Sequence, residues 1–460
     1  MKFTAALRLP DLPCLALVGA GGKSSALLCL ARELAQVHRT VLVTTTTHLG
    51  EWQVGAGDGH VVIQAGEPLE AGIEFPRGVV FVTGPVNDDQ RVGGLNTTAI
   101  GQLNEVAKRK QYPLLIEADG ARQLPLKAPA EHEPVITEFV EQVVVCAGLS
   151  GLGKPLSGVW VHRPERFGGL SGLEQGELIT PEAVSRVLMH PQGGLKGMPE
   201  QARRILLLNQ ADTEEEQAQA NTIAQQCMQA FHAVIVAALD KSAEDSGTIE
   251  DKAAQSEIYA VHEAMGGIVL AAGGATRYGA LKQLLLWKGS PLVRHAARAA
   301  LQAGLSPVVV VTGAGAELVA QAVAGLPVRQ VRNDAWQQGQ SISLQAGLRA
   351  LPPTSGGAIF LLADQPNITP GLIQALVEAH SQSLAPIVAP LVDGQRGNPV
   401  LFDAVTFADL LQLNGDAGGR QLFRKYALQY VPWHDRSVLQ DIDQPEDYAR
   451  LSGEERGRDG

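Results

Sequence analysis

A loop of small residues, with an arginine and a lysine just beyond it, is the feature of this sequence best suited to chemistry. It follows the apolar, β-branched run Gly267–Leu270, which predicts a buried strand. Small side chains let backbone N–H groups approach anionic oxygens, and two cations supply the charge that a nucleoside triphosphate requires. We therefore predict a nucleotide site in which Arg277, Lys282 and, further along the chain, Asp364 are catalytic; the nucleotide would contact Ala271, Ala272, Gly273 and Gly274.

Two acidic segments further along the chain could hold the metal ion that accompanies a triphosphate. Asp364 directly follows the apolar run 358–363, where burying a bare carboxylate is costly. Mg²⁺ is the natural partner of that acid, and Asp443, within 441–447, supplies a second ligand. The alternative for this second segment is a helix N-terminus with acids in its first turn. Both hold if Asp443 binds the metal while residues 444–447 cap the helix.

The order of these motifs resembles that of one family of nucleotidyltransferases. The pattern A-A-G-x-x-x-R-x-G-x-x-K is similar to the nucleotide loop of the MobA-like NTP transferases, and the run 286–292 is most similar to the branch that cytidylylates the molybdenum cofactor. The resemblance implies an α/β, Rossmann-like (GT-A-like) domain with a mostly parallel sheet. It also implies further site residues: Gly339, Ser341 and Ser343 near base and ribose, and Asn398, Asp416 and Arg420 on the acceptor side.

For the reaction, the resemblance implies transfer of CMP from CTP to molybdopterin cofactor with release of pyrophosphate. The acceptor phosphate is already an anion near neutral pH, so the protein need only align the reactants and neutralise like charges. Guanylyl-transferring relatives carry L-A-G-G where this chain has Leu270-Ala271-Ala272-Gly273, which favours CTP. A guanylyl or sugar-phosphate nucleotidyltransferase is an alternative, and so is a chaperone that carries or inserts molybdopterin.

A second phosphate loop lies near the N-terminus. The apolar run 15–18 predicts a strand, and apolar residues recur at helical spacing from 27 to 37. In the loop between them, which contains Gly19, Gly21 and Gly22, Lys23 would reach the terminal phosphates and Ser24 would ligate Mg²⁺. A complete Walker A pattern has glycine where this chain has Leu17, so the alternative is a glycine turn that caps an ordinary helix.

An acid and an amide could complete this first nucleotide site. The hydrophobic run 112–116 predicts a strand that leads to Asp119, which we predict to be linked to Mg²⁺. Asn209 and Asp212 resemble the first and last residues of the N-K-x-D motif that reads guanine, although Gln210 replaces the lysine. The bound nucleotide would be GTP or ATP.

Three histidines could gather with Asp119 around a second ligand or a metal. They are His48, His132 and His162. Because spacing alone does not bring them together, we favour the alternative of separate loop and core histidines with satisfied hydrogen bonds.

The first half of the chain also resembles a known family. The similarity to YqeC, a family of accessory proteins of selenium-dependent molybdenum hydroxylases, covers about residues 10–235. It rests on the segments 43–48, 117–122, 125–134, 153–156 and 161–164. The resemblance implies a role in maturing a molybdenum enzyme, with a molybdenum hydroxylase apoenzyme as partner.

Length and composition set the organisation of the chain. At 460 residues we expect two α/β domains, a P-loop-like domain over 1–239 and a nucleotidyltransferase domain over 266–451. A polar linker over 240–265 would join them, and a flexible tail would follow from 452 to 460.

Charge and cysteine content narrow the class of protein. A net charge of −11 argues against general nucleic-acid binding. The four scattered cysteines fit a reducing cytoplasm better than a disulfide framework or a zinc site. Prolines interrupt any signal peptide, and no run approaches the ~20 apolar residues of a membrane span, so we expect a cytoplasmic protein without membrane contact.

Overall fold

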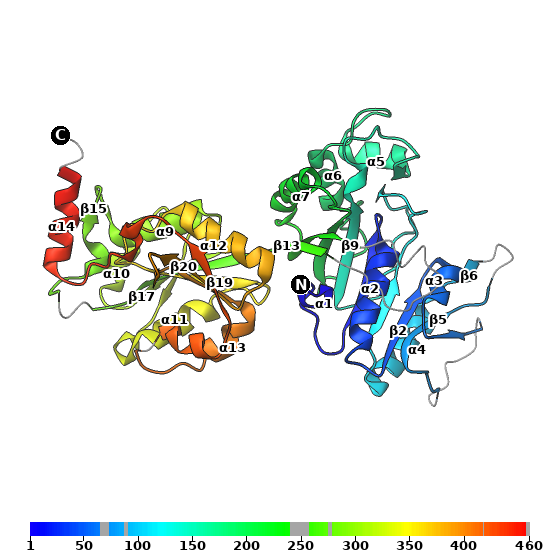
Figure 1. Ribbon diagram of the computed structural model, residues 1–460, viewed down its shortest axis with the longest axis horizontal. Coiled ribbons are helices and arrows are strands. Elements are labelled where there is room, and N and C mark those ends of the chain that lie inside the picture. The colour runs from blue at the N-terminus through cyan, green and yellow to red at the C-terminus, as the bar shows by residue number, and fades with distance from the viewer. Residues whose placement is uncertain (65–72, 87–90, 240–256, 275–277, 417, 457–460) are drawn as a thin grey trace. The chain divides into compact units, whose positions relative to one another are not determined.

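The computed structural model describes residues 1–64, 73–86, 91–239, 257–274, 278–416 and 418–456 of the chain (Figure 1). It divides into two compact units, Met1–His262 and Glu263–Gly460. Both are α/β folds built on a mostly parallel sheet, as predicted. Among the described helices, none is both long and apolar enough to cross a membrane.

A nine-stranded sheet forms the centre of the first unit, in the order β13-β12-β11-β9-β1-β7-β2-β5-β4. Neighbouring strands from β12 to β4 run parallel, so their carboxyl ends meet at one edge. The strands are β1 (Cys14–Gly19), β2 (Thr40–Thr45), β4 (Gly59–Val62), β5 (Gly78–Thr83), β7 (Leu114–Glu117), β9 (Gln142–Gly148), β11 (Arg203–Asn209), β12 (Ala233–Ala238) and β13 (Glu257–Glu263).

Helices and two short ribbons surround this sheet. In one ribbon, β8 (Leu126–Lys127) pairs with β10 (Val161–His162) and places Lys127 opposite His162. In the other, β3 (His48–Gly50) pairs with β6 (Arg91–Gly93). The helices are α1 (Phe3–Ala6), α2 (Lys23–Ala35), α3 (Glu51–Gly55), α4 (Thr97–Lys110), α5 (Pro164–Ser171), α6 (Pro181–Met189) and α7 (Glu214–Cys227).

The second unit has a sheet in the order β18-β17-β14-β19-β22-β20-β21, with β23 paired to β20. Its first four strands are parallel, and β22 lies antiparallel between β19 and β20. The strands are β14 (Met265–Ala271), β17 (Val308–Thr312), β18 (Arg329–Arg332), β19 (Gly357–Leu362), β20 (Ile387–Val392), β21 (Gln395–Arg396), β22 (Val400–Asp403) and β23 (Leu428–Pro432); β15 (Leu286–Trp287) and β16 (Ser290–Pro291) form a separate ribbon.

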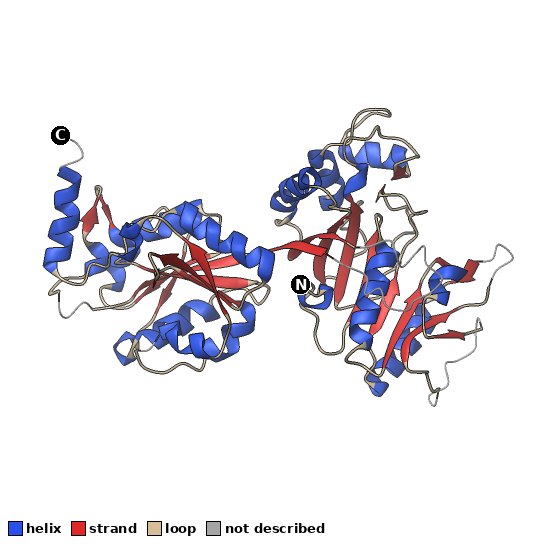
Figure 2. Ribbon diagram, viewed as in Figure 1, coloured by secondary structure: helices blue, strands red, loops and turns tan. Residues whose placement is uncertain are grey.

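Helices cover both faces of this second sheet, α9 and α12 on one side and α11 and α13 on the other (Figure 2). Successive side chains of a strand point to opposite faces, so Val269 packs into the core with α9 and α12, and Ile268 into the core with α11 and α13. The helices are α9 (Leu292–Gln302), α10 (Ala316–Ala322), α11 (Gln340–Arg349), α12 (Pro370–Ser383), α13 (Phe407–Leu410) and α14 (Pro445–Arg456).

Two predicted boundaries are wrong in part. Within the predicted linker, residues 240–256 lie outside the described chain, but Glu257–Glu263 form β13 in the sheet of the first unit. Ile258, Ala260 and Val261 are buried there, which the polar stretch before them obscured. The predicted tail also starts too early, because α14 continues to Arg456.

Candidate functional site

The predicted nucleotide loop of the second unit borders a pocket of about 390 Å³ at the carboxyl end of β14. The predicted residues that line it are Ala271, Ala272, Gly273, Gly274, Lys282, Gly339, Ser343, Asp364 and Asp416. Arg277 lies outside the described residues. Ser341 is buried and does not line the pocket; its backbone N–H donates to Gly415 at 3.1 Å.

The Lys282 ammonium lies between two predicted metal ligands. Its Nζ is 3.1 Å from Asp364 Oδ2 and 3.0 Å from Asp443 Oδ1. Burial disfavours the charge of Lys282, but the two carboxylates outweigh burial and raise its pKa above the ordinary 10.5. The structure thus brings together three predicted residues from segments far apart in the sequence.

The donor set of this pair fits Mg²⁺. Both carboxylates reach solvent, with 27% of the Asp364 side chain and 73% of the Asp443 side chain exposed. Over the described ranges, no three His, Cys, Asp or Glu side chains are grouped to hold a metal by themselves. Mg²⁺ commonly takes one or two carboxylates and completes its shell with water and substrate phosphates, which two exposed acids beside a phosphate loop allow.

The second acidic segment begins a helix, as its alternative interpretation predicts, and the role of Asp443 as a metal ligand stays a prediction. Asp447 Oδ2 accepts the backbone N–H groups of Asp443 at 3.1 Å and Gln444 at 2.9 Å. These bonds satisfy donors at the N-terminus of α14 and leave the Asp443 carboxylate beside Lys282.

Sequence reasoning missed two side chains that shape the phosphate loop. The buried Gln283 donates from Nε2 to the carbonyls of Ala271 at 3.2 Å and Gly273 at 3.0 Å. The Trp336 ring packs against Gly274 so closely that a Cβ there would lie 2.6 Å from it. The position of Gln283, directly after the predicted Lys282, was the one sign in the sequence that it could belong to the site. The contact between Trp336 and Gly274 depends on the tertiary fold.

A second pocket of about 440 Å³ adjoins the first. All three predicted acceptor residues, Asn398, Asp416 and Arg420, line it. The two pockets share Leu270, Gln340, Leu362 and Asp416, so molecules bound in them would meet.

An unforeseen aromatic group forms part of this second pocket. The Phe423 ring stacks on Phe402 at a centroid distance of 6.2 Å, and the Arg396 guanidinium lies 4.3 Å from the Phe423 centroid. A planar, anionic acceptor suits such a surface.

In the first unit, the predicted phosphate loop links β1 to α2 and lines a cleft of about 1690 Å³. Gly21 has a φ of +76° and Gly22 of +104°, and a Cβ at Gly22 would lie 2.2 Å from Asn209 Nδ2. Lys23 Nζ donates to the carbonyl of Gly19 at 2.7 Å and lies 3.2 Å from Asp119 Oδ1. The Lys23 side chain therefore folds back over the loop that precedes it.

The structure does not support base reading by Asn209 and Asp212. The Asn209 amide is committed to the protein, since Nδ2 donates to the Gly21 carbonyl and Oδ1 accepts from Leu239 N–H, both at 2.9 Å. Asp212 is exposed and does not line the cleft. Asn209 is a positioning residue that fixes the phosphate loop.

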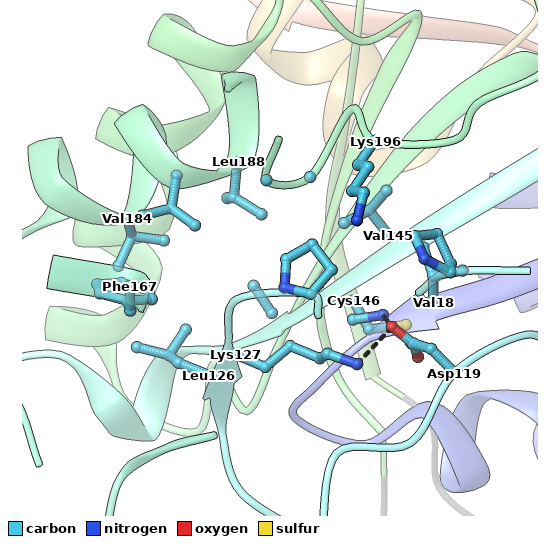
Figure 3. Close-up of a pocket in the computed structure, with 17 residues that line it drawn as sticks. Val18, Asp119, Leu126, Lys127, Val145, Cys146, Phe167, Val184, Leu188 and Lys196 are labelled. Carbon is cyan, nitrogen blue, oxygen red and sulfur yellow. Dashed lines mark hydrogen bonds and ion pairs between the residues drawn. The ribbon is translucent and has the colours of Figure 1, made fainter. Parts of the chain in front are cut away.

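The predicted role of Asp119 as a metal ligand also needs correction. Its carboxylate accepts from Gly19 N–H and is 2.7 Å from Lys127 Nζ, beside a small cavity of about 40 Å³ behind the loop (Figure 3). Glu117 lines the cleft instead, and its buried Oε2 has no hydrogen-bond partner in the described structure. Burial raises the pKa of Glu117. Ser24 lines the same cleft, so Ser24 and Glu117 are the pair that fits a nucleotide-bound Mg²⁺.

A chain of alternating charges joins this loop to the opposite side of the cleft. Lys127, which pairs with Asp119, also forms an ion pair with Glu133, with 2.9 Å between Lys127 Nζ and Glu133 Oε2. The Arg163 guanidinium donates hydrogen bonds to both Glu133 carboxylate oxygens, at 2.9 and 3.1 Å. Lys127 and Asp119 are almost fully buried. Buried charges require such pairing, because an isolated ion in the interior is very unfavourable.

The three predicted histidines line this one cleft without forming a metal cluster among the described residues. Burial and, after it, the neighbouring cations Arg163, Lys127 and Arg122 together lower the pKa of His162 to about 4. His162 is therefore neutral at pH 7.

We expect the first unit to lose stability in two steps as the pH falls. Between pH 6.5 and 4 the unfolded chain protonates His162 while the folded chain does not, and below 4.5 the same holds for Glu133, whose folded pKa is about 2. Protons bound preferentially by the unfolded state lower the unfolding free energy. Thermal unfolding between pH 7 and 3 measures both steps, and His162→Asn should make the upper one smaller but not abolish it, because burial also lowers the pKa values of His60, His232 and His262. A midpoint that is constant from pH 6.5 to 4 would contradict this.

Comparisons with known proteins agree with the division into two units. The model of the YqeC protein family matches residues 15–165, and that of the MobA-like NTP transferase domain matches residues 267–431. The chain is 34% identical over 199 residues to the uncharacterized protein YqeC of Escherichia coli (strain K12), a match that covers 42% of this chain and 75% of that protein.

The chain is also similar to a curated protein and to a protein of known structure whose names do not mention YqeC. The chain is 32% identical over 195 residues to nicotine blue oxidoreductase of Paenarthrobacter nicotinovorans, which covers 40% of this chain and 95% of that protein. A crystal structure of the Mycobacterium tuberculosis rv0371c homolog from mycobacterium sp. strain JC1 is 28% identical, covers 42% of this chain and 97% of that one, and superposes with a TM-score of 0.39.

Proposed function

Because the chain belongs to the YqeC protein family in its first unit and carries a MobA-like NTP transferase domain in its second, we propose that it matures a molybdenum cofactor by cytidylyl transfer. The second unit would transfer CMP from CTP to molybdopterin cofactor and release pyrophosphate. The observation that carries this proposal is a pocket lined by Lys282 and Asp364, with Asp443 paired to the same lysine, that adjoins a second pocket lined by the predicted acceptor residues.

The chemistry follows from this arrangement. A phosphate oxygen of the acceptor forms a new bond to the α-phosphorus of CTP, and the bond from that phosphorus to the β-phosphate oxygen breaks. Lys282 neutralises charge that builds up on the leaving pyrophosphate, and the backbone of Ala271–Gly274 orients the phosphates. Mg²⁺ held by Asp364 and Asp443 would supply further charge neutralisation. The nucleophile is an anion already, so no general base is required.

Pyrophosphate release by the purified chain tests this function directly. The assay contains Mg²⁺ and molybdopterin cofactor and compares CTP, GTP, ATP and UTP. Release with CTP alone supports the proposal, whereas release with GTP alone replaces it by guanylyl transfer. Silence with all four nucleotides, with intact cofactor, favours a different acceptor or a protein that carries molybdopterin without modifying it.

We expect Arg420→Ala to weaken acceptor binding. Arg420 is an exposed cation in the acceptor pocket, and loss of one charge-assisted contact raises KM for the acceptor about tenfold or more, with KM for CTP little changed. Steady-state kinetics with each substrate varied in turn measures the effect. Arg424→Ala is the matched control, since Arg424 belongs to the same 3₁₀ helix (Gly418–Arg424) but does not line the pocket. An equal effect of both variants would argue against acceptor contact.

For the first unit, we propose an ATP or GTP site in which the phosphates bind Gly19–Ser24. The Lys23 ammonium would exchange Asp119 and the Gly19 carbonyl for a terminal phosphate, and Ser24 and Glu117 would hold Mg²⁺. This site would serve a molybdenum hydroxylase apoenzyme, the partner that the YqeC resemblance implies, in the cytoplasm.

A further inference from the structure

The cleft of the first unit is larger than a nucleotide requires. Its volume is about 1690 Å³, whereas pockets for small ligands commonly enclose about 300–1,000 Å³. The phosphate loop, Ser24 and Glu117 contribute one part of the lining. The lining also contains Arg122, His132, His162 and Arg163, which we call the arginine wall, together with Glu133.

Backbone conformation directs the two arginines of this wall. Arg122 and Gln123 are consecutive non-glycine residues in the left-handed region, with φ of +52° and +60°, and Arg163 has a φ of +66°. Such conformations are unfavourable and persist only where the surrounding structure imposes them, often at ligand sites. Arg163 binds Glu133, but the exposed Arg122 side chain has no hydrogen bond or ion pair with any residue that the structure describes.

The arginine wall carries a surplus of positive charge. Its nearest acid, Glu133, is already paired with both Lys127 and Arg163. Burial is the main cause of the lowered pKa of His162, and Arg163, Lys127 and Arg122 lower that pKa further than burial alone would, with Glu133 acting in the opposite direction. His162 lies opposite the buried Lys127 in the β8–β10 ribbon, so the positive electrostatic potential of the arginine wall extends from the cleft towards the protein interior. A compact anion would neutralise the wall.

We propose that the arginine wall binds the phosphate group of a second ligand, a phosphorylated small molecule that shares the cleft with the nucleotide. This inference rests on the nucleotide site proposed for the first unit. The ligand would place its phosphate against the free guanidinium of Arg122 and the exposed edge of Arg163. Guanidinium groups bind phosphate oxygens in pairs, which makes arginine well suited to this contact.

Inorganic phosphate is the probe, and the ring of His162 is the reporter. The full-length chain is labelled with ¹⁵N-histidine, and the resonance of His162 is assigned by its loss in His162→Asn. Saturating phosphate should raise the pKa of His162 from about 4 towards its ordinary 6.5, because the anion offsets the arginines. The shift of the His162 resonance with phosphate concentration also yields the affinity.

Variants separate this site from the nucleotide site. Arg122→Ala should weaken phosphate binding at His162 about tenfold or more, while Arg109→Ala, which removes an exposed cation from α4, should leave it within about twofold. Lys23→Ala should abolish binding of ATP and GTP to the first unit but preserve the response of His162 to phosphate.

Two results would overturn the inference. One is a His162 resonance that does not respond to phosphate. The other is a response that survives in Arg122→Ala but disappears in Lys23→Ala, which would place the phosphate in the nucleotide loop. If instead Lys23→Ala binds nucleotide normally while Arg122→Ala still weakens phosphate binding, the proposed nucleotide site is wrong and the second anion site is supported.

Discussion

Replacement of Asp364 by asparagine should lower the rate of pyrophosphate release by at least about a hundredfold. Asparagine keeps the size of the side chain but removes the negative charge that faces Lys282 and that would hold Mg²⁺. Lys282 retains Asp443 at 3.0 Å, so the variant should fold normally. The measurement is single-turnover release of pyrophosphate with saturating CTP, Mg²⁺ and acceptor, together with the thermal unfolding midpoint.

The matched control is Asp393→Asn. Asp393 occupies a turn between β20 and β21 with a φ of +48°, which asparagine tolerates, and it pairs at the surface with Arg436. We expect this variant to keep full activity. If Asp364→Asn is as active as the control, Asp364 takes no part in the reaction and the metal site is assigned wrongly.

Replacement of Lys127 by methionine should destabilise the first unit by about 3–5 kcal/mol. Lys127 is buried between Asp119 and Glu133, at 2.7 and 2.9 Å, and methionine fills its volume without its charge. In the variant, Asp119 keeps its ion pair with Lys23 at 3.2 Å but loses the shorter one with Lys127. Glu133 keeps its ion pair with Arg163 but loses Lys127, the more buried of its two partners. Each carboxylate stays buried but loses a charge-assisted hydrogen bond that offsets its desolvation, and loss of a partner from a buried ion-pair network is strongly destabilising.

Urea unfolding followed by circular dichroism measures this effect in the full chain. Lys108→Met, at an exposed position on α4, is the control and should change the unfolding free energy by less than about 0.5 kcal/mol. A loss below about 1 kcal/mol in Lys127→Met would mean that the charge chain contributes little to stability. Pyrophosphate release by the second unit reports whether that unit is still folded.

The arrangement around Lys282 was foreseeable because it depends on a general property of parallel sheets. Asp364 follows β19 and the phosphate loop follows β14, and these strands are parallel neighbours. Carboxyl ends of parallel strands meet at one edge, so residues that follow them converge without further information. The adjoining acceptor pocket was foreseeable only through the resemblance to a family, since Asn398 and Arg420 lie on loops that no periodicity positions.

The errors in the first unit have a different origin. Glu117 and Asp119 are two residues apart, and both looked equally able to face a nucleotide. Lys127, on β8, binds the carboxylate of Asp119, which does not line the cleft, whereas Glu117 does. Likewise, the short motif around Asn209 suggested base recognition, but the amide of Asn209 holds the Gly21 carbonyl.

The sequence by itself determined the two α/β units, the positions of their strands and phosphate loops, and the groups that meet at the carboxyl ends of parallel strands. These features follow from apolar periodicity and from glycine and proline, which act over a few residues. Only the tertiary structure decided that Glu117 and not Asp119 lines the first cleft, that β13 belongs to the first sheet, and that Arg122 lines the same cleft as Lys23 with no partner among the described residues. Those outcomes depend on ion pairs and packing between residues distant in sequence, whose approach no local pattern encodes.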